Sequence, residues 1–214
     1  MDFVAALSHI LASCPNVDRL SLNLIPVANP SDAIQQMALT IGDWMDSRTF
    51  QCLRIFFHSD LFLAQVLRGQ VSTKVLDLVT QPDSYGRASP ARAILSQSAC
   101  QALSHVLGVQ DFTADCGIPR DVLTKSDPTK NWSLVTIAAL PPDGCATLSA
   151  NLVTLLQLHA ETIESLRIED ELDYGELEAQ APLPQHSLVL PRLNKLELVV
   201  TVPSMSFEPL ESRC

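Results

Sequence analysis

A chain of 214 residues with 47% hydrophobic residues is long and apolar enough to fold around a core, which argues against disorder. Its net charge of −10 excludes nucleic acid and anionic membrane surfaces as favoured partners, because both select basic proteins. Charged residues, Gln or Pro interrupt every apolar run before the ~20 residues that cross a bilayer, so we expect no membrane association.

The first apolar segment, Phe3 to Cys14, predicts an amphipathic helix. Its last four residues, Leu11-Ala12-Ser13-Cys14, superficially resemble a lipoprotein cleavage box. However, Met1-Asp2 supplies no Lys or Arg, and His9 interrupts the apolar run, so the helix is favoured over a signal peptide.

The six cysteines are too far apart to form a paired CxxC-type metal site, and their spread does not suggest a disulfide scaffold. We therefore expect buried, reduced thiols in a cytoplasmic or nuclear protein. The cysteines are Cys14, Cys52, Cys100, Cys116, Cys145 and Cys214.

One short pattern recurs along the chain: apolar, two variable residues, apolar, one variable residue, apolar. The clearest copy is Leu193–Leu198 and the weakest is Ser104–Val109. The copies begin at residues 17, 50, 73, 104, 132, 163 and 193. Their mean spacing of about 29 lies at the upper end of the range for leucine-rich repeats. Each copy predicts a strand whose fourth and sixth residues face the core, while the residues between them face outward.

Helical periodicity between these copies predicts a helix in most intervals, as a strand-plus-helix repeat requires. Ser31 and Asp32 can cap one such helix, and Pro90 stands at the expected start of another. Proline-rich loops are expected at residues 141–144 and 182–184. The apolar stripes of the helices comprise Val4, Leu7, Ile10 and Leu11; Ile34, Met37, Ala38 and Ile41; Leu61, Ala64, Val66 and Leu67; Ile94, Leu95 and Ala99; and Leu148, Leu152, Leu155, Leu156 and His159.

These elements predict an α/β fold in which residues 1–214 form a single leucine-rich-repeat solenoid of about seven irregular repeats. Its curved parallel sheet would carry the helices on the convex side. Because the sequence shows no polar end caps, we expect an array truncated at one or both ends. A doubly wound α/β domain is the alternative, but no GxGxxG or GxxxxGK[ST] occurs and only seven glycines are present.

Three segments resemble repeats of fungal F-box/leucine-rich-repeat proteins: Ala12–Leu22, His159–Ile168 and Leu190–Leu198. In that family the repeats recognise substrates, and the F-box binds the adaptor of a cullin ubiquitin ligase. Because the first predicted element is a repeat helix, we expect no F-box within these 214 residues. The resemblance therefore implies only the substrate-recognition half, and contact with the cullin adaptor would require an F-box upstream.

Catalytic and metal-binding patterns are lacking in the sequence. No GxSxG is present, the five His residues show no HxH or HxxxH spacing, and His58-Ser59-Asp60 is best interpreted as a polar helix cap. We expect no enzyme activity, no metal and no cofactor. The acidic stretch 161–178 does not match the residue pattern of a Ca²⁺-binding loop. It predicts a solvated loop, or alternatively a docking edge for a basic partner.

We therefore expect a non-catalytic protein-protein interaction module whose partner is a protein of unknown identity. The finer hypothesis is the substrate-recognition region of an F-box-like ubiquitin-ligase receptor. A stand-alone adaptor or inhibitor is the alternative, and a small α/β hydrolase with a perturbed Ser, Cys or His in a deep pocket is a further one. The predicted partner-binding residues on the concave face are Arg19, Ser21, Arg54, Asp77, Arg167, Glu169, Lys195 and Glu197.

Overall fold

The computed structural model describes residues 3–23, 32–57, 59–80, 94–139, 150–171 and 188–201. The strands are β1 (Arg19–Asn23), β2 (Thr49–Phe57), β3 (Val71–Thr80), β4 (Val106–Leu107), β5 (Asp111–Ala114), β6 (Thr136–Ala139), β7 (Ser165–Glu171) and β8 (Lys195–Thr201). The helices are α1 (Phe3–Ala12), α2 (Asp32–Met45), α3 (Asp60–Val66), α4 (Gln97–Leu103), α5 (Arg120–Ser126) and α6 (Ala150–Leu158).

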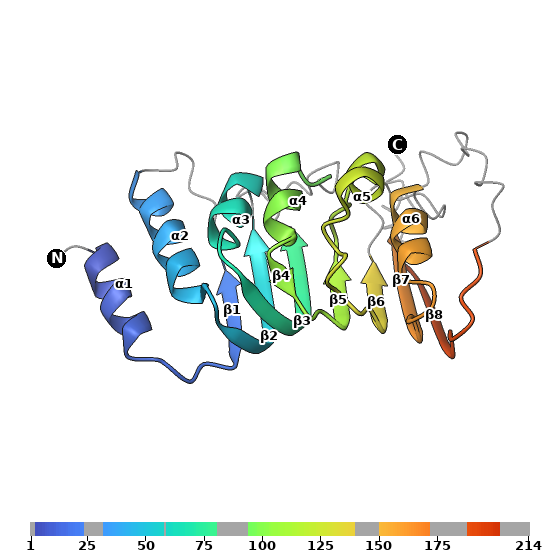
Figure 1. The fold of residues 1–214 in the computed structure, drawn as a ribbon, viewed down its shortest axis with the longest axis horizontal. Coiled ribbons are helices and arrows are strands. Elements are labelled where there is room, and N and C mark those ends of the chain that lie inside the picture. Colours follow the sequence, from blue (N-terminus) through green and yellow to red (C-terminus); the bar gives the residue numbers. More distant parts are fainter. Residues whose placement is uncertain are drawn as a thin grey trace, which may run out of the picture.

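The eight described strands form one sheet in which every pair is parallel. Seven of them follow chain order, β1-β2-β3-β5-β6-β7-β8, and the short β4 pairs with β3. The order never reverses, whereas the strand order of a doubly wound sheet does. Figure 1 shows the helices in a row, also in chain order, alongside the row of strands. The α/β prediction is therefore confirmed.

The strands are held in register by two rows of mostly aliphatic side chains that face the helices. The first row matches the fourth position of the repeat, and the second row matches the sixth. In the central strands these side chains are almost completely buried, together with residues of α2, α3, α4 and α6. The first row is Leu20, Leu53, Leu76, Phe112, Ile137, Leu166 and Leu196, and the second is Leu22, Ile55, Leu78, Ala114, Ala139, Ile168 and Leu198.

Two predicted repeats were wrong in register. Phe112, rather than Leu107, occupies the fourth position of its repeat. The cause is that Val106 and Leu107 form only a short ladder with β3, after which Gly108, with a φ of 74°, turns the chain. Ile137 was predicted at the sixth position and occupies the fourth. The strand expected to begin at Trp132 begins only at Thr136, because a turn precedes it.

The turn before β6 is fixed by Trp132. Its indole Nε1–H donates to the Val106 carbonyl oxygen at 2.8 Å, and its ring lies 5.1 Å from that of Phe112. A buried indole needs such an acceptor, so this side chain ties together two neighbouring repeats that the pattern alone placed incorrectly.

The helix expected to include Ile94 and Leu95 starts later. Pro90 and Leu148 lie outside the described residues, and Ile94 forms an isolated bridge to Gly117 instead of a helical turn. Helix α4 begins at Gln97, where the Ser96 hydroxyl accepts a hydrogen bond from Ala99 N. The other predicted helices are confirmed as α1, α2, α3 and α6, and α5 was not predicted.

The expectation of buried cysteines holds for only part of the described chain. Cys100 and Cys116 are buried and free, whereas Cys14 is exposed and Cys52 is half-buried. Burial raises the pKa of Cys100 to about 12, so its thiol stays protonated at neutral pH. Cys145 and Cys214 lie outside the described residues.

Within the described ranges, every helix is too short or too polar to span a membrane.

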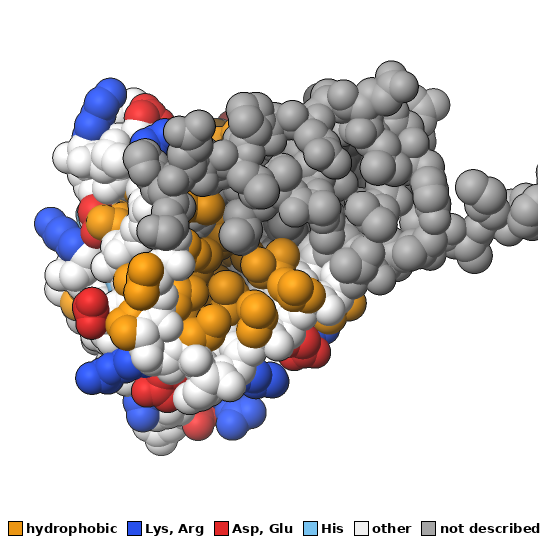
Figure 2. All heavy atoms as spheres, turned by 90° about the vertical axis from the view of Figure 1, so that its right-hand side faces the viewer, with side chains coloured by type: hydrophobic (Ala, Val, Ile, Leu, Met, Phe, Trp, Pro, Cys, Tyr) orange, Lys and Arg blue, Asp and Glu red, His pale blue; other side chains and the backbone are white. Residues whose placement is uncertain are grey.

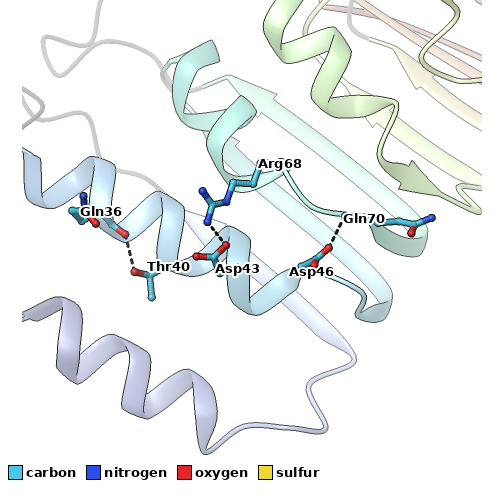
Figure 3. A network of polar contacts seen from close by, with 6 residues as sticks. All are labelled: Gln36, Thr40, Asp43, Asp46, Arg68 and Gln70. Carbon is cyan, nitrogen blue, oxygen red and sulfur yellow. Dashed lines mark hydrogen bonds and ion pairs between the residues drawn. The ribbon is translucent and has the colours of Figure 1, made fainter.

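Helices α2 and α3 approach closely at Gly42. A Cβ at this position would lie 2.6 Å from the Gln65 carbonyl oxygen, so only glycine fits. Figure 3 shows the polar contacts beside it: Arg68 pairs with Asp43, and Asp46 Oδ1 accepts from Gln70 N at 2.8 Å. These contacts join neighbouring repeats through their helical layer.

We expect Gly42→Ala to lower the free energy of unfolding by about 1–3 kcal/mol, because the new methyl group meets backbone that cannot yield. Urea denaturation followed by circular dichroism measures the change. Gln35→Ala, on the exposed side of α2, is the control and should stay within about 0.5 kcal/mol of the wild type. A neutral or stabilising Gly42→Ala would contradict the close approach.

Candidate functional site

The side of the sheet turned away from the buried rows is the candidate site, and we call it the polar face. Neighbouring strands align their side chains across it, so that Ser21 lies beside Arg54, and Arg54 beside Asp77. The central row of the polar face, read from β1 to β8, is Ser21, Arg54, Asp77, Thr113, Ala138, Arg167 and Glu197.

Among the described residues of the polar face, Arg54 and Asp77 form the charge pair with the most deeply buried carboxylate. Arg54 Nε donates to Asp77 Oδ2 at 2.8 Å, and Nη2 lies 2.7 Å from the same oxygen. The hydrogen bond to Asp77 raises the pKa of Arg54 above its usual value. The Asp77 side chain is only 9% exposed, whereas that of Arg54 is 51% exposed. The guanidinium is therefore held in place while part of it remains accessible to a partner.

Arg19 and Ser21 lie next to this pair on β1. Arg19 is in register with Cys52 and Ser21 with Arg54, and both β1 side chains are exposed. The structure thus brings four predicted residues onto three adjacent strands.

The other four predicted residues gather on β7 and β8. Arg167 pairs with Glu169, and its Nη1 lies 3.5 Å from Glu197 Oε1. Lys195 Nζ lies 3.6 Å from Glu197 Oε2. All four side chains are at least one-third exposed, so each pair contributes at most about 1 kcal/mol to stability. This network can rearrange around a partner at little cost.

In the central row two neutral residues separate these charged groups, although β5 carries the charged Asp111 in the adjacent outward row. In the central row β5 carries Thr113 and β6 carries Ala138, both half-buried. The predicted site residues therefore share one face without forming one cluster.

Sequence reasoning missed the apolar members of the polar face. Phe56 lies in register with Val79, and both are half-buried, as is Val75. The alternation Leu53-Arg54-Ile55-Phe56 places Phe56 on the outward side, a signal that a search for charged residues overlooks. Asp115, directly after β5, accepts from Thr80 N at 2.7 Å.

The acidic stretch was only partly described correctly. Strand β7 extends to Glu171, so Glu169, Asp170 and Glu171 belong to a strand and not to a solvated loop. Residues 172–178 lie outside the described part of the chain.

The suggested cap at the start of α3 is polar, as expected, but it is not closed by a serine hydrogen bond. Ser59 occupies the N-cap position without a side-chain hydrogen bond, and Asp60 Oδ2 accepts from Ser96 N. His58 lies outside the described residues. In the described ranges no three His, Cys, Asp or Glu side chains are grouped to hold a metal ion.

One buried histidine has a shifted pKa, but it lies beyond the end of helix α6 and not on the polar face. His159 Nε2 is 2.9 Å from Thr129 Oγ1, which donates to Asp127 Oδ1 at 2.6 Å. Burial lowers the pKa of His159, and the nearby Asp127 carboxylate partly opposes this. The neutral ring can donate from Nε2 to the threonine oxygen, so the contact joins α6 to the turn after α5.

The comparisons with known proteins add no identification. No protein-family model, no curated protein and no solved structure matches this chain.

We expect Arg54→Met to lower the free energy of unfolding by roughly 1–2 kcal/mol, because it leaves the buried Asp77 carboxylate without this partner. The double variant Arg54→Met/Asp77→Leu should recover at least half of the loss, since it removes both charges. Urea denaturation measures both changes. Arg167→Met, in the more exposed network, is the control and should cost no more than about 0.5 kcal/mol. Equal losses in the free energy of unfolding for Arg54→Met and Arg167→Met would contradict the stated difference in burial between the two charge networks.

The lowered pKa of His159 predicts a pH-dependent stability. Because the unfolded chain, with a histidine pKa near ~6.5, takes up this proton first, the free energy of unfolding should decrease as pH falls below about 6.5. Urea denaturation at several pH values measures the slope. His159→Gln should reduce the slope, while His9→Gln, at an exposed site on α1, should retain it. Identical slopes for both variants would rule out His159 as the cause.

Proposed function

We propose that the chain is a non-catalytic protein-binding module, a curved leucine-rich-repeat solenoid that holds its partner on the polar face. The observation that supports this most is the uninterrupted row of outward side chains from Ser21 to Glu197. Parallel strands in chain order, each separated from the next by a helix or a connecting segment, are what stacked repeats require. Such a surface suits an extended or convex protein segment.

The chemistry of the polar face supports a protein partner over a nucleic acid. Acidic and basic side chains alternate at both ends, and no continuous basic stripe is present among the described residues. Half-buried Phe56 and Val79 add apolar area beside a fixed arginine. Arginine and aromatic residues commonly dominate binding energy at protein interfaces.

Within this proposal, the finer role is the substrate-recognition region of an F-box-like ubiquitin-ligase receptor. It rests on the three segments that resemble repeats of that family, among them Leu190–Leu198. A stand-alone adaptor or inhibitor would use the same polar face.

A small α/β hydrolase remains the enzymatic alternative and needs a pocket with an activated Ser, Cys or His. Among the described residues, an open hollow of about 520 Å³ lies at the start of α5. None of its described lining residues is Ser, Cys or His: they are Ile94, Pro119, Arg120, Asp121, Thr124 and Asn151. This hollow does not supply the activated residue that a hydrolase requires.

Affinity purification with quantitative mass spectrometry from the native cells tests the proposal through two matched substitutions. Thr113→Arg places a long charged side chain in the middle of the polar face, whereas Thr124→Arg makes the same change on the exposed side of α5. We expect Thr113→Arg to reduce recovery of a specific partner at least about tenfold, and Thr124→Arg to leave it unchanged.

The identity of that partner separates the finer roles. Cullin and its adaptor in the wild-type eluate support the ligase-receptor role, and one other protein without them supports a stand-alone adaptor. Equal recovery with both variants would show that the polar face does not bind. Labelling of the chain by a fluorophosphonate, which reacts with activated serines, would favour the hydrolase.

A further inference from the structure

Arg54 presents hydrogen-bond donors on the polar face, while the carboxylate that holds it is hidden. A guanidinium carries five N–H donors in a fixed, planar fork. Asp77 Oδ2 lies 2.8 Å from Nε and 2.7 Å from Nη2, and no other described residue hydrogen-bonds to this guanidinium. The edge between Nη1 and Nη2 can therefore receive a second carboxylate. Because Asp77 is 9% exposed and Arg54 is 51% exposed, a partner meets the guanidinium first.

Arg19 adds a second exposed positive charge at this end of the polar face. It lies on β1, beside β2, and forms no ion pair with a described residue. The carboxylates among the outward residues of β1, β2, β3 and β5 are Asp77 and Asp111, and Asp111 is half-buried on β5. The net charge of −10 opposes an acidic partner only weakly, because at physiological ionic strength charges more than about 8 Å apart are largely screened.

Arg167, at the other end of the polar face, does not have this asymmetry. It pairs with both Glu169 and Glu197, whose side chains are 34% and 39% exposed. Figure 2 views that end of the molecule and shows both acidic and basic side chains along its lower border. Exposed carboxylates therefore lie next to Arg167, and they oppose the approach of an acidic group.

Apolar side chains accompany Arg54 on the polar face. Phe56 follows it by two residues on β2 and lies in register with Val79 of β3, and both are half-buried. Two residues of a strand span roughly 6.6 Å, and alternate side chains of any extended segment have the same spacing and point the same way. An extended segment lying along β2 can therefore place a carboxylate on Arg54 and an apolar side chain on Phe56 and Val79 at the same time.

We propose that the β1–β3 end of the polar face binds an extended protein segment in which one residue separates an Asp or Glu from a large apolar residue. The carboxylate accepts hydrogen bonds from Nη1 and Nη2 of Arg54, and Arg19 adds attraction. The apolar side chain covers Phe56 and Val79. This inference rests on the proposed function, because it names the chemistry of the partner that the polar face holds.

Selection from a displayed library of random decapeptides, with the full 214-residue chain as bait, tests the proposal. We expect the enriched peptides to carry an Asp or Glu one residue away from a large apolar residue. Fluorescence anisotropy then gives the dissociation constant of an enriched peptide. Replacing its Asp by Asn, or its Glu by Gln, should weaken binding at least about tenfold.

A double-mutant cycle identifies Arg54 as the group that meets this carboxylate. The variant Arg54→Met/Asp77→Leu should weaken binding of the acidic peptide at least about tenfold, and should bind the acidic and the amide peptide equally. The variant Arg68→Met/Asp43→Leu removes a similar pair from the helical layer, drawn in Figure 3, and is the matched control. It should leave both dissociation constants unchanged. Circular dichroism confirms that each variant is folded.

The failure of this inference differs from the failure of the proposed function. Enriched peptides that need no carboxylate, but are lost with Thr113→Arg, would overturn the inference and leave the proposed function standing. Peptides that bind Thr113→Arg as tightly as the wild type would overturn both. A library in which no peptide is enriched over selection without bait would overturn the inference alone, and the affinity purification would then decide the proposed function.

Discussion

The parallel register of the two buried rows is the constraint on which the rest of the structure depends. Leu53 and Leu76 are fully buried and lie opposite one another, and the same alignment is repeated from strand to strand. A slip by one residue would turn Arg54 and Asp77 into the apolar layer, where their charges would lose water. Burial on one side thus determines which side chains the polar face presents on the other.

Much of this arrangement follows from sequence pattern, and its failures have a common physical cause. The pattern correctly placed Leu20, Leu166 and Leu196, where large aliphatic residues occupy both the fourth and the sixth position of the repeat. It failed at β5 and β6, which fill the sixth position with alanine and the fourth with Phe112 and Ile137. A search for leucine-like spacing then selects nearby apolar residues instead. The positive φ of Gly108 and the Trp132 contact, which set the true register, leave no periodic signal.

For the candidate site, the sequence predicted which residues face outward but not which of them lie close together. Outward-facing positions could be read from alternation, so all eight proposed residues lie on the polar face. Which of them meet depends on pairing between strands far apart in sequence, as for Arg54 and Asp77. The neutral division at Thr113 and Ala138 could not be foreseen, because it required the correct register of β5 and β6. The half-buried Phe56 depends on its neighbours in space, which periodicity does not reveal.

The two neutral residues at the centre of the row from Ser21 to Glu197 have a consequence for communication along the molecule. Strand contacts join successive neighbours, such as β3 with β5, β5 with β6, and β6 with β7. No charged side chain of the central row bridges β5 and β6. Along this row, a ligand bound at Arg54 would therefore influence Arg167 by shifting the packed backbone between them, and not through a chain of charged pairs. The two charged ends should be only weakly coupled, so that one partner spanning both would gain avidity while two separate partners would bind with little cooperativity.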